Sequence, residues 1–323
     1  MIHAPELLDL LSSEAPVSGA DLARRLRVSR AAVWKQIEAL RAGGLSIQAR
    51  AGEGYRLARP LDRLDAAAIR RALPAAVRKR IGVLEVHWKL DSTSSELLRR
   101  VEELPDRAFV FAEMQTAGRG RRGRNWVSPP ASNLAFSCLK RFEQGYAALS
   151  GLSLAVGVAS ARALHACGVK DVGVKWPNDL VCRGAKLAGI LVELGGEFLG
   201  PCHAVIGIGV NVHLPGDARA AIAQPVADLA ELCGEAPPRN ELAAAMVEHV
   251  CVALDAFAVS GFAAFAADYA RDDVLRGRVL RVDDPRGVFE GVAMGVDARG
   301  ALRVRTQGGE RAVDSAEVTV RAQ

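Results

Sequence analysis

Paired cysteines are absent from this 323-residue chain, because its six cysteines stand alone and none forms a Cys-x-x-Cys pair. This spacing supports neither a zinc site nor a disulfide framework, so we expect reduced thiols. The N-terminus lacks the basic and then apolar order of a signal peptide. We also expect no membrane span, which needs ~18 consecutive apolar residues. These absences predict a cytoplasmic protein that acts without a membrane.

A large charge excess is also lacking, since 42 Lys and Arg face 37 Asp and Glu. This balance excludes a polycation that coats nucleic acid without selectivity, so any basic site must be local. The chain has no Walker motif, no G-x-S-x-G and no H-E-x-x-H. Covalent serine or cysteine catalysis and zinc hydrolysis therefore have no support. At ~150 residues per domain, the length predicts two or three globular domains.

The first sixty residues predict a helix-turn-helix followed by a hairpin. Ser29 caps a helix in which Val33, Ile37 and Leu40 share one face, and residues 45–57 have the pattern of a hairpin with a glycine turn. The second helix of such a winged domain enters the DNA major groove. Protein docking or dimerisation is the alternative use. The expected DNA contacts are Ser29, Arg30, Lys35, Gln36, Arg50 and Arg56.

Residues 118–124 alternate glycine with arginine directly after a predicted strand over 107–115. The run has the form G-x-G-x-x-G, but a dinucleotide-binding fold requires a helix next, and Pro129-Pro130 excludes one. We instead expect a mobile loop whose guanidinium groups close over an anion such as a triphosphate, with Trp126 at its end. An exposed basic loop that binds nucleic acid is the alternative.

The predicted strand over 205–212 has two unlike faces. Its period of two places isoleucine and valine on one face and Gly207, Gly209 and Asn211 on the other. A glycine-lined face lets a flat ligand lie against the backbone, although a strand bent for packing has the same pattern.

Three charged residues, Lys175, Asp179 and Lys186, lie at the ends of neighbouring apolar strands. Beside an arginine loop, the two lysines supply fixed positive charge between two anions. Joining a carboxylate to a nucleotide α-phosphate requires such charge.

The tail and the alanine-rich segment before it complete the chain. Short strands over 279–282, 288–294, 301–306 and 317–321, with a turn at 297–300, predict a small barrel. Residues 237–270 are predicted to form a packing helix without chemistry.

Five segments together resemble the biotin protein ligases. They are Asp91-Ser-Thr-Ser94, Gln115 to Arg124, Lys175-Trp-Pro-Asn-Asp179, Lys186 to Glu193 and Gly207-x-Gly-x-Asn211. With the winged helix in front, the chain resembles the bifunctional ligases that also repress the biotin operon. The resemblance implies an α+β protein with three domains. These are a winged helix-turn-helix over 1–60, a catalytic domain of the class II synthetase-like biotin ligase fold with a mixed sheet over 61–272, and an SH3-like β-barrel over 273–323.

The resemblance also implies a two-step reaction. Biotin and MgATP give biotinyl-5′-AMP, and a lysine of the biotin carboxyl carrier protein of acetyl-CoA carboxylase then takes the biotin. We hypothesise that the adenylate also acts as corepressor by favouring a homodimer on the operator DNA of the biotin genes. A biotin sensor without ligase activity, a ligase whose winged helix does not repress, and a lipoate or octanoate transferase are the alternatives.

The resemblance assigns residues to this chemistry. Biotin is expected to contact Ser92, Thr93, Ser94, Gln115, Gly118, Arg119, Arg121, Lys186, Gly189, Gly207 and Gly209. The nucleotide is expected to contact Arg119, Arg121, Arg124, Trp126, Lys175, Asn178, Asn211 and Arg321. The catalytic residues are expected to be Lys186, Arg121 and Asp179, and Asp179 is also the candidate ligand for Mg²⁺. Ser94 departs from the asparagine that is frequent in the repressor-type proteins.

Overall fold

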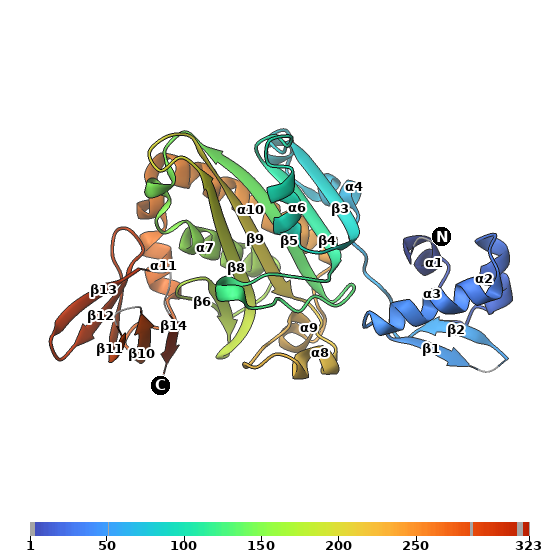
Figure 1. Cartoon of the computed structure of the whole chain (residues 1–323). Coiled ribbons are helices and arrows are strands. Elements are labelled where there is room, and N and C mark those ends of the chain that lie inside the picture. Colours follow the sequence, from blue (N-terminus) through green and yellow to red (C-terminus); the bar gives the residue numbers. More distant parts are fainter. Residues whose placement is uncertain (1–3, 51, 285–286, 315–318, 323) are drawn as a thin grey trace.

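The computed structural model describes residues 4–50, 52–284, 287–314 and 319–322. The N-terminal part stands at one end of a larger central body, and a small sheet lies at the opposite end (Figure 1). The N-terminal elements are α1 (Ala4–Asp9), α2 (Gly19–Arg25), α3 (Arg30–Ala42), β1 (Ile47–Arg50) and β2 (Gly54–Leu57). The Ser29 hydroxyl accepts a hydrogen bond from the Ala32 amide at 3.1 Å and so caps α3. The predicted helix-turn-helix and wing are confirmed.

A seven-stranded mixed sheet forms the central body. Its order is β3 (Val83–Leu90), β4 (Ala108–Gln115), β5 (Asn133–Phe142), β9 (Cys202–Asn211), β8 (Ala185–Gly196), β7 (Asp179–Cys182) and β6 (Val172–Lys175). Only the pair β3 and β4 is parallel within this described sheet. Strand β3 was missed by the sequence analysis, although Leu84, Val86 and Trp88 alternate with polar residues in it.

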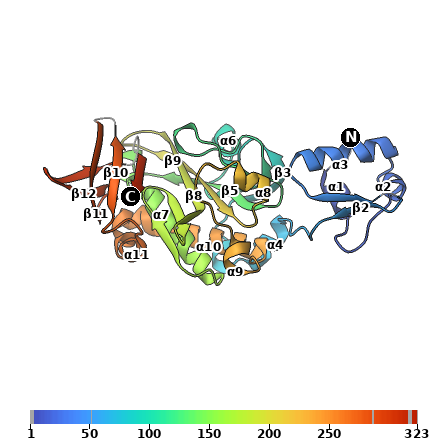
Figure 2. The ribbon, with the colours of Figure 1, turned by 90° about the horizontal axis from the view of Figure 1, so that it is seen from below.

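Helices lie on both sides of this sheet (Figure 2). They are α4 (Ala66–Ala72), α5 (Ala75–Arg78), α6 (Thr93–Arg99), α7 (Leu152–Ala166), α8 (Gly216–Ala220), α9 (Leu229–Cys233), α10 (Arg239–Ser260) and α11 (Ala266–Asp272). The apolar helices α7 and α10 pack against each other, and both bury leucine and valine in the main core. This packing covers one face of the sheet.

The expectation that no apolar run reaches the length of a membrane span is wrong. Residues Arg239–Asp272 are long and apolar enough by length and composition. However, α10 buries Leu242, Met246, Val250 and Leu254 completely in the core. We therefore interpret this segment as the predicted packing helix, which ends at Ser260 and is followed by α11.

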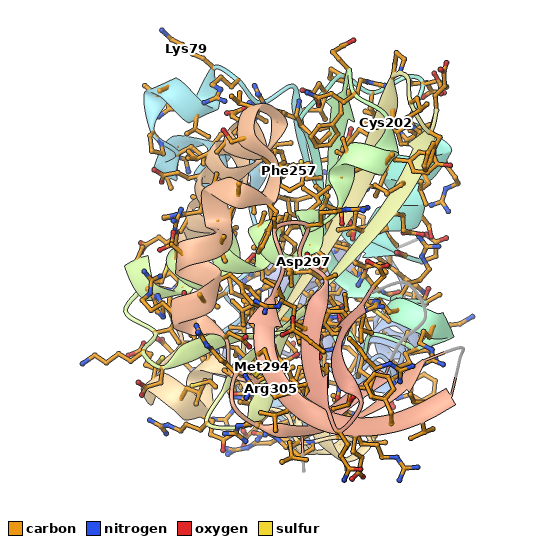
Figure 3. The ribbon with its side chains drawn as sticks, turned by 90° about the vertical axis from the view of Figure 1, so that its left-hand side faces the viewer. Lys79, Cys202, Phe257, Met294, Asp297 and Arg305 are labelled. Carbon is orange, nitrogen blue, oxygen red and sulfur yellow. The ribbon has the colours of Figure 1, made fainter. Side chains whose placement is uncertain are left out.

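The C-terminal part is a five-stranded antiparallel sheet. Its order is β13 (Gly309–Val313), β12 (Leu302–Thr306), β11 (Gly287–Val296), β10 (Val279–Asp284) and β14 (Thr319–Ala322). Strand β13 was not predicted, because its mostly exposed sequence has no alternating pattern. The predicted turn is confirmed, since Asp297 Oδ1 accepts hydrogen bonds from the Arg299 and Ala301 amides. This turn adjoins the central body (Figure 3), where Trp176 Nε1 donates to the Gly300 carbonyl at 3.1 Å.

A buried ion pair attaches the linker after the winged helix to the central body. Arg239 Nη1 lies 2.8 Å from Glu113 Oε2, and both side chains are almost inaccessible. Glu113 also accepts from the Leu64 amide at 2.5 Å, and Arg239 donates to the Asp62 carbonyl at 2.6 Å. Sequence analysis did not find this pair, because its two residues are far apart in the chain. It fixes the segment that follows the winged helix against β4, the strand that leads to Gln115.

Candidate active site

A cluster of buried hydroxyl groups lies where α6 meets β4 and β5. Gln115 Oε1 accepts from the Thr93 amide at 2.9 Å, and Ser92 caps the helix by accepting from the Ser95 amide. The Ser137 hydroxyl lies 2.7 Å from Thr93 Oγ1 and 2.9 Å from Ser94 Oγ. These buried groups include both hydrogen-bond donors and acceptors, the kinds of group that orient the polar head of a small ligand.

Sequence analysis missed Ser137, which is fully buried. The signal was present, because it is the only hydroxyl residue in the apolar strand β5. Its strand pairing places it opposite Gly207, and a Cβ added to Gly207 would lie 2.7 Å from Ser94 Oγ. Glycine at 207 therefore leaves room for the hydroxyl cluster.

The glycine–arginine run folds back on itself beside this cluster. The Trp126 amide donates to the Gly118 carbonyl at 2.8 Å, and the Gly120 amide donates to the Arg124 carbonyl at 2.7 Å. A Cβ on Gly118 would lie 2.5 Å from the Trp126 carbonyl oxygen, so glycine is required there. The run contains a short 3₁₀ turn at Arg121–Gly123. The predicted loop is thus a closed hairpin-like segment, and its mobility stays a prediction.

Two arginines of this loop reach the neighbouring strands. Arg119 forms an ion pair with Glu193 of β8. Arg121 Nη1 donates to Asn178 Oδ1 at 3.4 Å, and Asn178 is itself held because its Nδ2 donates to the Ile190 carbonyl at 2.7 Å. Burial lowers the pKa of Arg121, but an arginine keeps its charge at neutral pH. The loop therefore carries positive charge over the edge of the sheet.

The Trp126 indole covers the glycine-lined face of β9 and β8. A Cβ on Gly209 would lie 2.6 Å from Trp126 Cζ2, and one on Gly189 would lie 3.3 Å from Trp126 Cζ3. The predicted division of the β9 faces is confirmed, since Ile206, Ile208 and Val210 are buried in the core on the other side. A flat group does lie against the bare backbone, and it belongs to the protein's own tryptophan. Its Nε1 is buried without a hydrogen-bond partner among the described residues.

Lys186 and Asp179 meet next to this indole. Lys186 Nζ lies 2.7 Å from Asp179 Oδ1 and 5.8 Å from the centre of the Trp126 ring. The contact with Asp179 is an ion pair without the angles of a hydrogen bond, so the carboxylate oxygen still lacks a directional donor. Asn211 is buried, and its Nδ2 donates to the carbonyls of Lys186 at 3.3 Å and Ala227 at 3.1 Å. Asn211 therefore positions the backbone that carries Lys186.

The remaining candidate residues lie around or outside this site. Lys175 pairs with Asp179 across β6 and β7, so its backbone borders the site. Arg321 lies in β14, of which the structure describes the backbone alone. On the winged helix, Arg30 and Lys35 are exposed, Arg56 Nη2 donates to Gln48 Oε1 at 2.6 Å, and Arg50 pairs with Glu53.

The side chains that the structure describes near the site do not form a metal site by themselves. Among the described residues, no group of three or more His, Cys, Asp or Glu side chains could hold a metal ion. Asp179 is also engaged by Lys186. Lys186 lies beside the glycine-lined face, and Arg121 interacts with Asp179 next to it, so an anionic ligand with a flat part could compete for these cations.

Three families match separate parts of the chain. Residues 87–211 match the biotin/lipoate A/B protein ligase family, residues 6–56 match a helix-turn-helix domain family, and residues 277–321 match the biotin protein ligase C-terminal domain.

Individual relatives match almost the whole chain. The chain is 37% identical over 317 residues to the bifunctional ligase/repressor BirA of Salmonella typhimurium, covering 98% of this chain and 97% of that protein. It is 38% identical over 304 residues to the Escherichia coli protein of the same name, and this match covers 94% of this chain and 92% of that protein. Its fold resembles that of a biotin protein ligase from Aquifex aeolicus in complex with biotin and ATP. That match has a TM-score of 0.65 at 25% identity, and covers 75% of this chain and 99% of that one.

Proposed function

The chain belongs to the family of bifunctional biotin protein ligases and repressors, and from this membership we propose that it makes biotinyl-5′-AMP from biotin and ATP. We infer that the adenylate then delivers biotin to a lysine of the biotin carboxyl carrier protein of acetyl-CoA carboxylase. Catalysis is assigned to residues 61–272 and DNA binding to residues 1–60. The C-terminal domain is assigned to residues 273–323, and Arg321 is assigned as a nucleotide contact.

The hydroxyl cluster is assigned to the polar head of biotin. Thr93, Ser94 and Gln115 supply donors and acceptors there, next to Gly118 and Gly207, where any larger residue would collide with Trp126 or Ser94. The alkyl chain of the ligand then runs over Gly189 and Gly209 toward Lys186. In this arrangement Trp126 moves from the glycine-lined face to the adenine.

One observation carries the proposal for the first step: Lys186 Nζ lies beside Asp179 and the Trp126 indole, within the same site as Arg121. A biotin carboxylate oxygen attacks the α-phosphorus of ATP, the bond to the bridging β-phosphate oxygen breaks, and pyrophosphate leaves. Two anions must approach each other, so fixed positive charge lowers the barrier. Lys186 and Arg121 supply that charge, and Asn211 holds Lys186 in place. ATP enters as its magnesium complex, whose metal is held mainly by phosphates.

In the second step, the carrier's lysine amine attacks the acyl carbon of the adenylate and AMP leaves with the bonding electrons. The amine must lose a proton, since its reference pKa is ~10.4. Asp179 is the carboxylate in the site that receives it, once the ligand has drawn Lys186 away. The loop with Arg119, Arg121 and Arg124 closes over the adenylate and limits its hydrolysis.

The test is transfer of biotin to the apo carrier domain in the presence of ATP. Lys186→Ala is expected to slow adenylate formation ~10²- to 10³-fold, the cost of losing one positioned transition-state donor. Lys79→Ala is the matched control, because Lys79 projects from the surface (Figure 3). Label transfer at the wild-type rate by Lys186→Ala would disprove the assigned role. Absence of transfer by the wild-type chain would leave a biotin sensor without ligase activity.

Repression is the second half of the proposal. The adenylate favours a homodimer, which presents two winged helices to a palindromic operator of the biotin genes. The DNA-binding surface is assigned to Ser29 at the N-cap of α3, to Arg30, Lys35 and Gln36 on α3, and to Arg50 and Arg56 on the wing. A gel shift on the promoter of the organism's own biotin-synthesis genes, with and without biotin plus ATP, tests this half. Equal binding under both conditions would contradict a corepressor role for the adenylate.

A further inference from the structure

A large aromatic side chain is exposed on the helix that we assign to DNA. Trp34 of α3 is 58% exposed, and it is the only strongly exposed large apolar side chain among the described residues of the winged helix. A tryptophan ordinarily buries most of its surface inside a protein or at an interface. Its position and its charged surroundings indicate what covers it.

Trp34 lies on the outward face of α3. The inward face buries Val33 and Ile37 completely, whereas Arg30 and Lys35 are exposed on the same side as Trp34. Side chains of a helix lean toward its N-terminus, so the indole extends over the turn that begins at Arg30. The small side chain of Ala31, three residues earlier, leaves it uncovered.

The sequence around Trp34 is basic, although Arg24 and Arg25 form ion pairs with Asp21. Between Asp21 and Glu38 the sequence contains five cations and no acidic residue: Arg24, Arg25, Arg27, Arg30 and Lys35. A protein partner that buries a tryptophan through an apolar contact does not require this charge, but a duplex with its phosphates does. The major groove also offers an apolar group, the C5 methyl of thymine, that an exposed side chain on a recognition helix contacts.

We propose that Trp34 is a specificity-determining residue of the winged helix, which reads thymine methyl groups in the major groove of the operator. The inference rests on the proposed DNA binding. It separates two roles on one helix, because Arg30 and Lys35 bind phosphates or base edges while Trp34 selects sequence through apolar contact. Removal of Trp34 must therefore change specificity and leave the electrostatic part of the affinity unchanged.

The test compares the full-length wild type with Trp34→Ala and Trp34→Phe, each with biotin and ATP. The probes are the promoter fragment of the biotin-synthesis genes and an unrelated duplex of equal length. Trp34→Ala is expected to weaken promoter binding ~10-fold or more, the scale for one lost base contact, while its affinity for the unrelated duplex stays unchanged. Trp34→Phe is expected to keep part of the preference. Ligase activity and thermal unfolding of each variant serve as controls for folding.

A second arm tests the methyl contact itself. Promoter probes in which deoxyuridine replaces thymidine lack the C5 methyl, so they are expected to weaken binding by the wild type and not by Trp34→Ala. Equal promoter affinity of wild type and Trp34→Ala would overturn this inference and leave the proposed repression intact. An equal loss of affinity for the promoter and for the unrelated duplex would do the same. A change in self-association without a change in DNA binding would show that Trp34 meets protein instead. If the wild type itself fails to bind the promoter, the proposed repression and this inference fall together.

Discussion

Removal of the Ser137 hydroxyl tests whether the buried cluster stabilises the catalytic domain. Ser137→Ala deletes one oxygen that lies 2.7 Å from Thr93 Oγ1 and 2.9 Å from Ser94 Oγ. Each hydrogen bond contributes a net ~1 kcal/mol, so the loss of two lowers the free energy of unfolding by about 2 kcal/mol. Thr93 keeps its contact with Gln115, whereas Ser94 is left buried with its hydroxyl unpaired.

Ser160→Ala is a matched control within the same domain. Ser160 lies in α7 and is also fully buried, but its hydroxyl has no hydrogen-bond partner among the described residues. Both substitutions remove the same atom from a packed interior, so the cavity that they create contributes about equally. The difference between the two variants therefore isolates the hydrogen bonds of Ser137. Ser160→Ala is expected to be neutral or stabilising, because it removes an unpaired buried polar group.

The assay is urea-induced unfolding at pH 7, followed by far-UV circular dichroism, together with calorimetric titration of each variant with biotin. Ser137→Ala is also expected to raise the Kd for biotin, since Thr93 and Ser94 lose a common anchor. Ser160→Ala leaves that Kd unchanged. A difference in unfolding free energy below ~0.5 kcal/mol, the usual scatter for substitutions without a specific contact, would refute the hydrogen-bond argument.

Local sequence patterns predicted the helices, strands and turns whose structure depends only on residues close together in the chain. The helix carrying Val33 and Ile37 follows from a period that buries one face, and the two faces of β9 follow from strict alternation. The turn at Asp297 follows from its residue types. These features depend on a few neighbouring residues, so one sequence contains all of the information.

Features that depend on long-range pairing were not predicted. Glu113 and Arg239 pair across 126 positions, and neither residue type nor local spacing indicates a buried ion pair. Ser137 acquires its role only because β5 lies between β4 and β9 in the sheet. Likewise, the glycine-lined face was expected to contact a bound ligand, but strand order and loop closure bring Trp126 onto it. The structure brings several of the candidate residues predicted from the sequence together, while their partners follow from the topology.

Two further substitutions test the surroundings of the site. Asp91→Asn removes a carboxylate whose pKa is lowered to about 2, chiefly by a hydrogen bond from Arg99. Its stabilisation is present above the ordinary pKa of 3.8 and is lost as pH falls toward 2, so the variant's deficit in unfolding free energy should shrink over that range in urea titrations. Gly209→Ala places a methyl group 2.6 Å from Trp126 Cζ2, closer than packed carbon atoms approach, so the indole must leave the glycine-lined face. Because the substrate is proposed to run over the same glycine, we expect slower adenylate formation and a shift in tryptophan emission. Gly216→Ala, which adds a methyl into open space, should change neither, and an unchanged Gly209→Ala enzyme would show that this face does not hold the substrate.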